Sequence, residues 1–334
     1  MNLHELKEII LTLDNVLIIS HVNPDPDTLG SALGLKWILS KLNKKARIIC
    51  ANEVNERICG FLEIESTLDG VTAEDIEQGS FSHIVCVDVA AEAMLGKSLE
   101  MYKDKVDLVI DHHYTNTLFA HNTYLDEKAS ATGEIIYELA ESLALEPDRD
   151  FAKYVYCSII CDSGSFRFAS TTPKTMRIAA RLMETGFDFA KVNRLIFENK
   201  SLEQIAVERL AYNSLKFYCD GKIAVINITL DAKKEAGLEE SDIDGVSGIP
   251  RIIAGVEVGV LIKETDTSKL EDKNRQFRIS LRSNEYANVA EIAAHFGGGG
   301  HKRAAGCRFT AEADLANPAE YIEQALVKQI EQVL

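Results

Sequence analysis

Residues 15–31, NVLIISHVNPDPDTLGS, decide the fold of the first half of this chain. An apolar run rich in Val and Ile covers residues 15–22, which is typical of a strand buried on both faces. After Asp27 the apolar residues follow a helical period, with Ala32 and Leu35 on one face. A buried strand that enters a helix through a polar loop is the repeating unit of a parallel α/β sheet. We therefore predict an α/β fold that begins with this unit.

The pattern continues along the chain and predicts two domains. Three more apolar runs predict further strands of the parallel sheet, at 46–51, 83–90 and 106–111. Helical patterns follow, at 131–143, 150–161 and 173–185, and then one long polar helix over 188–213. The last part mixes strands (217–219, 223–230, 256–264, 276–282) with helices (242–254, 288–296, 319–333). We predict a first domain at 1–187, a helical linker at 188–215 and a smaller mixed α/β domain at 216–334.

Composition excludes several classes of protein. The chain has 334 residues, of which 36 are basic and 52 acidic, so its formal net charge is 36 − 52 = −16. A strongly negative surface repels phosphate backbones and argues against a binder of long nucleic acid. No apolar run approaches the roughly 18 residues of a membrane span, and the amino terminus does not resemble a signal peptide. We therefore expect a cytoplasmic protein with no membrane partner, and we leave a homodimer open.

Acids and imidazoles stand where apolar segments end. His21, Asp25 and Asp27 follow the first run, and Asp88 ends the third. Asp111, His112 and His113 end the fourth run, and Asp162 follows an apolar helix. Taken alone, the first loop also fits a simple turn with Asp27 as a helix N-cap. Together, these carboxylates and imidazoles form a ligand set that suits Mn²⁺, Mg²⁺ or Fe²⁺, unlike the thiolate-rich sets of structural zinc sites. They are numerous enough for two ions, which could activate water for phosphoryl transfer.

The carboxy-terminal part carries basic residues beside glycines. In QFRISLRS the period of two places Arg278, Ser280 and Arg282 on one strand face. Residues 297–300 are four glycines, which allow an anion to approach the backbone, and His301 follows them. A solvated strand face and a flexible linker are the alternatives. Between Lys273 and Arg308 seven basic residues face two acidic ones, a charge of 7 − 2 = +5, which favours a short phosphate ester as the ligand.

The order of these motifs resembles the DHH phosphoesterases that carry a DHHA1 domain, in particular the group of bifunctional oligoribonucleases and PAP phosphatases. HVNPDPDTLGS, VDVA, DHH with Asn116, and CDSGSFRFAST resemble the four DHH motifs. SLRS and GGGGHKRAAG resemble the DHHA1 signature. One position departs from the pattern, because Pro26 stands where members of this group often have glycine.

The resemblance implies a role for each matching residue. One metal ion would be bound by His21, Asp25 and Asp88, and the other by Asp27, Asp88, His112 and Asp162. His113 would face the substrate phosphate, and Asp111 would support the loop from behind the metal ligands. The substrate would be bound by Arg282, Ser283, Gly299, Gly300 and His301. The cofactor would be two divalent ions, Mn²⁺ first and Mg²⁺ as the alternative.

The expected activity is therefore a two-metal phosphoesterase with its active site between the domains. Its substrates would be short oligoribonucleotides, linear dinucleotides and 3′-phosphoadenosine 5′-phosphate. The alternatives are a cyclic-dinucleotide phosphodiesterase, a pyrophosphatase or exopolyphosphatase of family II type, and a nucleotide-binding regulator without catalysis. The glycine-rich tail argues against the pyrophosphatase, and the presence of all six ligands argues against the regulator.

Overall fold

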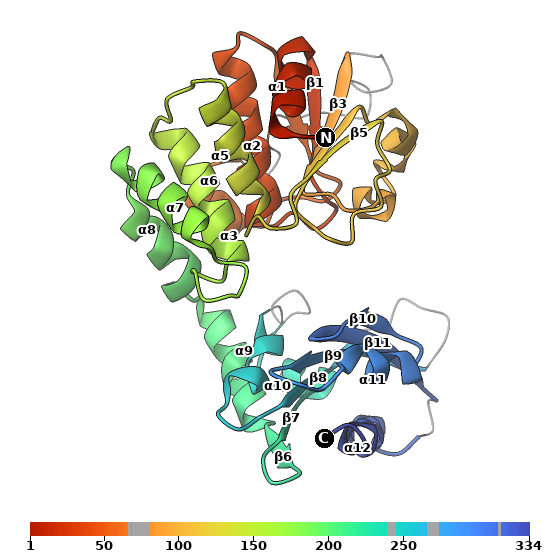
Figure 1. Ribbon diagram of the computed structural model, residues 1–334. Helices are drawn as coiled ribbons and strands as arrows, with labels where there is room; N and C mark the ends of the chain where they lie inside the picture. The colour runs from red at the N-terminus through yellow and green to blue at the C-terminus, as the bar shows by residue number, and fades with distance from the viewer. Residues whose placement is uncertain (66–67, 69–80, 239–244, 266–273, 313–314) are drawn as a thin grey trace. The chain divides into compact units, whose positions relative to one another are not determined.

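The computed structural model of the chain (Figure 1) contains two compact units, which comprise residues 1–199 and 200–334. It describes residues 1–65, 68, 81–238, 245–265, 274–312 and 315–334. Within these residues no helix is long and apolar enough to cross a membrane.

A five-stranded parallel sheet forms the centre of the first unit, as the sequence predicts. Its strand order is β2-β1-β3-β4-β5. The strands are β1 (Val16–Ile19), β2 (Ala46–Ile49), β3 (His83–Val87), β4 (Leu108–Asp111) and β5 (Asn122–Leu125). Strand β5 is not predicted by the sequence, because NTYL is too short and too polar to stand out as an apolar run. Both faces of β1 are buried, since Val16 and Ile18 contact one apolar cluster and Leu17 and Ile19 contact another.

Helices cover the sheet of the first unit. They are α1 (Leu3–Thr12), α2 (Pro26–Lys41), α3 (Glu56–Leu62), α5 (Thr132–Ser142), α6 (Arg149–Asp162) and α7 (Pro173–Glu184), with short 3₁₀ segments η1 (Glu92–Leu95) and η2 (Glu100–Lys105). Helices α2 and α6 lie side by side, because Gly30 has no side chain to separate them. A Cβ atom at Gly30 would lie only 2.4 Å from the Tyr154 carbonyl oxygen. This close packing brings the start of α2 against α6.

The prediction of one long helix over 188–213 is wrong. The segment forms α8 (Phe189–Asn193), a π-helical turn η3 (Arg194–Glu198) and a separate helix α9 (Leu202–Asn213). Ser201 starts α9 with a capping box, in which its hydroxyl accepts from the Gln204 N–H while the Gln204 side chain accepts from the Ser201 N–H. A capping box needs extended backbone at its first residue, so the preceding helix has to end before it.

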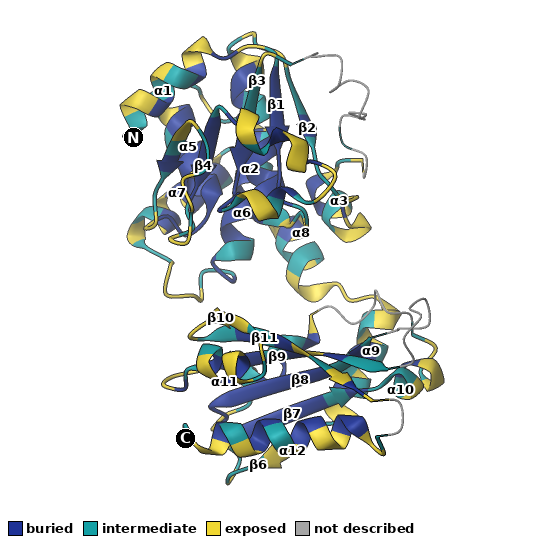
Figure 2. Cartoon of the chain, turned by 90° about the vertical axis from the view of Figure 1, so that its right-hand side faces the viewer, coloured by how far each residue is buried: buried dark blue, intermediate teal, exposed yellow. Residues whose placement is uncertain are grey.

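A six-stranded mixed sheet forms the centre of the second unit. Its order is β10-β11-β9-β8-β7-β6, and only the β7 and β8 pair is parallel. The strands are β6 (Lys216–Tyr218), β7 (Ile223–Ile228), β8 (Val258–Thr265), β9 (Arg275–Ser283), β10 (Gly299–His301) and β11 (Ala304–Ala311). Strands β7 and β8 are buried along most of their length (Figure 2).

Helices cover the two faces of this second sheet to different extents. Helices α11 (Val289–His295) and α12 (Pro318–Glu331) pack on one face in the larger cluster. Helix α9 and the 3₁₀ turns η5 (Val246–Gly248) and η6 (Pro250–Ile252) cover β7 and β8 on the other, where α10 (Leu230–Glu235) follows β7. The helix expected over 242–254 is thus two short turns where it is described, and residues 239–244 lie outside the described residues.

Candidate metal centre

The strand order of the first sheet creates a site beside β1 and β3. In the order 2-1-3-4-5 the chain runs outward in opposite directions from β1 and β3, and ligands of open α/β sheets bind at the carboxyl ends of two such strands. His21 follows β1 and Asp88 follows β3 directly. Asp111 is the last residue of β4, and His112 and His113 come next. The expected acids and imidazoles of the first unit therefore meet at one edge of the sheet.

The start of α2 places the first two acids of the site. Asp25, and not Asp27, is the N-cap of this helix, and its carboxylate accepts from the N–H groups of Asp27 at 2.9 Å and Thr28 at 3.1 Å. Pro26 occupies the first helical position, where its fixed φ and missing N–H are favourable. The proline that departs from the family pattern is thus compatible with the helix. Asp27 lies within the first turn and is 3% exposed.

The Asp27 carboxylate is held by four hydrogen bonds. Its Oδ1 accepts from the hydroxyls of Ser158 at 2.6 Å and Ser31 at 3.1 Å, and from the Gly133 N–H at 3.3 Å. Its Oδ2 accepts from the Thr132 N–H at 3.0 Å. These bonds come from α2, α5 and α6, so three helices fix one side chain. Ser158 and Thr132 are not predicted by the sequence, because nothing in its spacing relates them to Asp27.

Three overlapping groups of side chains could each hold a metal ion. They are His21, Asp25 and Asp88; Asp27, His112 and Asp162; and Asp88, His112 and His113. In the first group His21 Nε2 lies 3.5 Å from Asp25 Oδ2 and 3.6 Å from Asp88 Oδ2. In the second group His112 Nε2 lies 3.5 Å from both Asp27 Oδ2 and Asp162 Oδ2.

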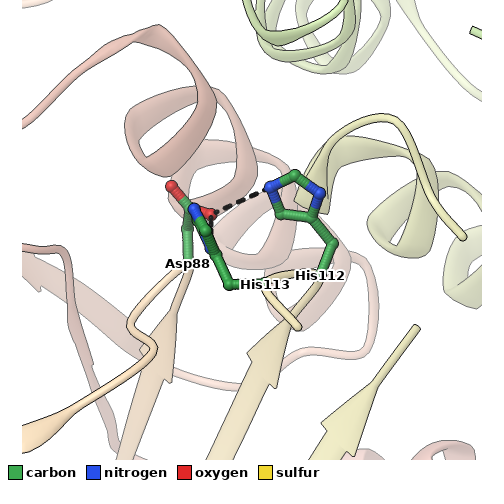
Figure 3. A group of neighbouring side chains, drawn as sticks. All are labelled: Asp88, His112 and His113. Carbon is green, nitrogen blue, oxygen red and sulfur yellow. Dashed lines mark ion pairs between the residues drawn. The ribbon is translucent and has the colours of Figure 1, made fainter. Parts of the chain in front are cut away.

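The third group was not expected as a set. In it, Asp88 Oδ1 lies 3.8 Å from His112 Nε2 and 3.5 Å from His113 Nδ1 (Figure 3). Asp88 thus lies next to imidazoles of all three groups, since His21 is also its neighbour. It adopts a left-handed backbone with φ of 60°, a conformation that is uncommon outside glycine and that often marks functional sites.

The ionised carboxylates of this site repel one another. Burial, together with the negative charge of Asp27, raises the pKa of Asp88 well above its usual range. The same two causes raise the pKa of Asp162 to about 6, although 41% of its side chain is exposed. Burial also raises the pKa of Asp27 itself. Divalent cations would offset this repulsion, because their positive charge favours the ionised form of each carboxylate.

His112 provides the most direct indication that the site fits a metal ion. Its Nδ1 lies 3.2 Å from the Ala129 carbonyl oxygen, which favours a proton on Nδ1 and leaves Nε2 with a free lone pair. That Nε2 atom is buried and has no hydrogen-bond partner among the described residues. A neutral imidazole oriented by a backbone carbonyl, with its other nitrogen facing carboxylates, is the usual arrangement of a metal-binding histidine.

His113 belongs to a separate hydrogen-bonded pair. Its Nδ1 lies 2.8 Å from Asp111 Oδ1, while Asp111 Oδ2 accepts from the Asn116 side chain at 2.7 Å. This contact raises the pKa of His113. Burial opposes ionisation of Asp111, but its hydrogen bonds to His113 and Asn116 outweigh burial and lower its pKa. His113 is thus oriented by a buried carboxylate, and its side chain is 39% exposed.

The predicted substrate residues of the second unit lie near one end of its sheet. Arg282 on β9 is directly opposite Ala304, and His301 on β10 is directly opposite the same Ala304 on its other side. Both side chains therefore point to the same face. Gly259 is opposite Arg282 on β8, and a Cβ atom there would lie 3.2 Å from the Arg251 backbone nitrogen. Arg251 is thus a close neighbour of Arg282, which no pattern in the sequence indicates.

The other predicted groups of this unit have structural contacts of their own. Ser283 points to the opposite face from Arg282 and is buried, and its hydroxyl donates to the Ala287 carbonyl at 2.8 Å. Two of the four glycines, Gly299 and Gly300, belong to strand β10, and Gly297 and Gly298 precede it. A Cβ atom at Gly300 would lie 2.6 Å from the Ala304 carbonyl oxygen, whereas one at Gly299 would meet nothing within 4 Å. Close backbone packing therefore explains why a glycine is needed at position 300, but it does not explain the glycine at position 299.

A row of three basic residues crosses the same face further along the sheet. Arg278 on β9 is directly opposite both Lys263 on β8 and Arg308 on β11. Like charges in directly opposite positions destabilise a sheet. Arg278 and Arg308 are exposed, and no carboxylate in the described part of the chain forms an ion pair with either. This face thus favours an anionic ligand.

Comparisons with known proteins agree with this geometry. The DHH family, N-terminal domain, matches residues 15–159, and the DHHA1 domain matches residues 220–328. The bifunctional oligoribonuclease and PAP phosphatase NrnA of Thermus thermophilus is 30% identical over 317 residues, which cover 94% of this chain and 90% of that protein.

Solved structures show the same fold. The crystal structure of an exopolyphosphatase-related protein from Bacteroides fragilis is similar with a TM-score of 0.85 at 23% identity, covering 99% of this chain and 97% of that one. RecJ from Thermus thermophilus in complex with Mn²⁺ gives a TM-score of 0.51 at 15% identity, covering 99% of this chain and 53% of RecJ.

Proposed function

This chain belongs to the DHH family of phosphoesterases and carries a DHHA1 domain, and from that premise we propose that it hydrolyses short oligoribonucleotides and linear dinucleotides to mononucleotides. We propose 3′-phosphoadenosine 5′-phosphate as a second substrate. The observation that carries the proposal is the set of three ligand groups that meet around Asp88. Support for the substrate class comes from the Thermus relative, whose name describes both activities.

The proposed cofactor is a pair of divalent cations, with Mn²⁺ preferred. His21, Asp25 and Asp88 would hold one ion, and Asp27, His112 and Asp162 the other, with Asp88 also near the second. Carboxylate and imidazole donors suit Mn²⁺, and RecJ of the same fold is in complex with that ion. Two such ions supply Lewis acidity and charge neutralisation for displacement at phosphorus.

The protein side chains would orient the scissile phosphate and supply positive charge. Asp111 fixes the His113 ring, and the raised pKa of His113 favours its protonated form. A protonated His113 can donate a hydrogen bond to a phosphate oxygen, and charge-assisted bonds of this kind are about twice as strong as neutral ones. We therefore assign His113 to binding of the scissile phosphate and Asp111 to its orientation.

The second unit would bind the remainder of the substrate. Arg282 and His301 share a face of its sheet, and Gly299 leaves open space beside them. A guanidinium can bind a phosphate through two parallel hydrogen bonds. Gly300 would act through the backbone of β10. Ser283 would act through the loop after β9, which its buried hydroxyl holds. The net charge of −16 favours short substrates over long ones.

Product analysis tests this proposal. The purified chain is incubated with a linear diribonucleotide, 3′-phosphoadenosine 5′-phosphate, a cyclic dinucleotide or pyrophosphate, each with Mn²⁺ and with Mg²⁺, and the products are separated by chromatography. We expect mononucleotides from the linear dinucleotide and inorganic phosphate from 3′-phosphoadenosine 5′-phosphate, faster with Mn²⁺. Asp88→Asn serves as the inactive control. Asp150→Asn is the matched active control, because 71% of the Asp150 side chain is exposed and it lies on the outer start of α6.

Other outcomes would identify the alternatives. Cleavage of pyrophosphate without cleavage of the dinucleotide would replace the proposal with a pyrophosphatase. Preference for the cyclic dinucleotide would make the chain a cyclic-dinucleotide phosphodiesterase. Tight nucleotide binding without any turnover would make it a regulator.

A further inference from the structure

The segment of residues 126–132, which comprises the loop between β5 and α5 and the first residue of α5, contacts three of the six candidate metal ligands. The Ala129 carbonyl oxygen lies 3.2 Å from His112 Nδ1. Thr132 donates from its backbone N–H to Asp27 Oδ2 and from its hydroxyl to Asp88 Oδ1, both at 3.0 Å. None of the hydrogen bonds that this segment forms within the described chain involves His21 or Asp25. The segment therefore orients the group around His112 more than the group around His21.

A buried carboxylate fixes this segment from behind. Glu134 is 0% exposed, and its Oε1 accepts from the Ser130 hydroxyl at 2.5 Å and from the Ser130 N–H at 3.3 Å. Ser130 lies next to Ala129 in sequence and two residues before Thr132. A shift of Ser130 would therefore move both of the groups that touch the metal ligands.

The second carboxylate oxygen of Glu134 shows that stabilisation of helix α5 alone does not explain why Glu134 is buried here. Its Oε2 atom is buried and has no hydrogen-bond partner in the described residues. The nearest cation is Lys174, whose Nζ lies 3.7 Å away and also contacts Glu138 at 3.1 Å and Asp126 at 3.4 Å. A buried carboxylate that is only partly compensated costs stability. An acid in the first turn of α5 would interact as well with the helix dipole from an exposed position.

We propose that Glu134, through Ser130, is a positioning residue for the metal-binding group of Asp27, His112 and Asp162. This inference rests on the proposed function, because it assigns Glu134 to one of the two proposed ions. Glu134 holds Ser130 in place, and Ser130 fixes the carbonyl and N–H groups that orient His112 and Asp27. Loss of the contact loosens the group of Asp27, His112 and Asp162, and leaves in place His21 and Asp25, to which this segment makes no hydrogen bond.

Mn²⁺ binding to variants of the whole chain tests the inference. Isothermal titration with Mn²⁺ is carried out on wild type, Ser130→Ala, Glu134→Gln and the double variant, after metal has been removed. We expect one of two Mn²⁺ ions to bind about tenfold more weakly in each single variant, at the lower end of what residues behind metal ligands contribute. The double variant should be no weaker than the single ones, because both changes remove one contact.

Glu138→Gln is the matched control. Glu138 lies one turn further along α5 and contacts the same Lys174, but no hydrogen bond connects it to Ser130. We expect its Mn²⁺ affinity to equal that of wild type. In activity assays, kcat of Ser130→Ala should fall at low Mn²⁺ and recover at high Mn²⁺, with KM for the dinucleotide unchanged. A purely structural role of Glu134 would lower thermal stability without this dependence on Mn²⁺.

The outcomes separate this inference from the proposed function. If wild type binds two ions and Ser130→Ala binds both as tightly, the positioning role is wrong. Equal weakening of both ions, or the same effect in Glu138→Gln, would also overturn it. If wild type binds no Mn²⁺, the proposed function itself fails. Because Ser130→Ala removes only one hydroxyl, it keeps the test decisive even if Glu134→Gln does not fold.

Discussion

The acidic edge of the first sheet and the basic face of the second sheet each gather side chains of like charge, but the charges in the two regions are of opposite sign. At the acidic edge, four carboxylates and three imidazoles lie in adjoining groups, and burial forces some of the acids toward protonation. On the basic face, Arg278 stands directly between Lys263 and Arg308, and Arg282 lies beside Arg251. Each region concentrates like charge, which destabilises a protein that contains no ligand.

The difference lies in how rigidly the two regions are built. Three of the four carboxylates of the acidic edge, those of Asp25, Asp27 and Asp88, accept hydrogen bonds. Asp27 alone accepts four, from three helices. On the basic face, Arg278 and Arg308 are exposed, and no carboxylate in the described part of the chain forms an ion pair with either. Metal ions require defined ligand geometry, whereas flexible cations can follow phosphates of different substrates. The comparison therefore predicts strong effects of substitution at the edge and graded effects on the face.

Asp88→Asn should have the largest effect. It removes the carboxylate that borders all three imidazoles of the site, so we expect turnover of a dinucleotide to fall by more than about 100-fold, beyond what residues behind metal ligands contribute. The same change removes a repelled buried charge, and the metal-free variant should melt at a higher temperature than metal-free wild type. Loss of activity with a lower metal-free melting temperature would show that Asp88 is a structural residue. Steady-state kinetics and thermal melts with chelator measure the two effects.

Arg282→Ala should have the next largest effect, on substrate binding. A hydrogen bond to a charged group contributes ~1.5–3 kcal/mol, which corresponds to an increase in KM of about 10- to 100-fold. Mn²⁺ affinity should not change, because Arg282 belongs to the second unit. A fall in kcat with unchanged KM would contradict the assignment of Arg282 to binding. Lys222→Ala, in the turn before β7, is a basic control on the same unit.

The double variant Arg278→Gln/Arg308→Gln should have a smaller and graded effect. Exposed ion pairs contribute ~0.2–1 kcal/mol each, so loss of two of them should weaken binding of a pentaribonucleotide by about two- to thirtyfold, with less dependence on salt. The free protein should become more stable, because a row of like charges is relieved. Fluorescence anisotropy at several salt concentrations, without metal, measures this. Unchanged binding and unchanged salt dependence would show that this row does not contact the substrate.

The smallest effect concerns pH and the metal-free protein. Burial and the charge of Asp27 raise the pKa of Asp162 from 3.8 to about 6, so the folded state binds more protons than the unfolded state between these values. The contribution of Asp162 to stability is therefore greatest below pH 4 and is lost as the pH rises through 6. Comparison of thermal melts of wild type and Asp162→Asn from pH 4 to 8 should show this difference. We expect saturating Mn²⁺ to remove it, and a difference that persists with Mn²⁺ would contradict binding at Asp162.

The sequence predicts the parts of the site that stand at the ends of buried strands. His21, Asp25, Asp88 and His112 are visible in the sequence because each follows an apolar run, and carboxyl ends of parallel strands meet at one edge. Thr132 and Ser158 are not visible, because they reach Asp27 only through helices brought together by Gly30 and Gly133. Glu134 is not visible because nothing in the sequence marks its contact with Ser130. A Cβ atom at Gly133 would lie 2.1 Å from the Ser158 hydroxyl.

The second unit was predicted less completely. The alternation in QFRISLRS correctly separates Arg278 and Arg282 from the core, because a strand period depends on local sequence alone. The alignment of Lys263 and Arg308 with Arg278 depends on strand register, which the sequence does not show. The glycine run is expected as an anion-binding loop, but its second half, Gly299 and Gly300, belongs to strand β10, because Gly300 packs against the backbone of β11.

The number of Mn²⁺ ions bound per chain is the most direct test of the central claim, that Asp88 joins two metal-binding groups. Metal-free wild type and Asp88→Asn are equilibrated with Mn²⁺, passed through gel filtration and analysed for manganese by mass spectrometry. The account predicts two ions per chain in wild type and fewer than one in Asp88→Asn. A single ion in wild type, or two ions retained by Asp88→Asn, would contradict it.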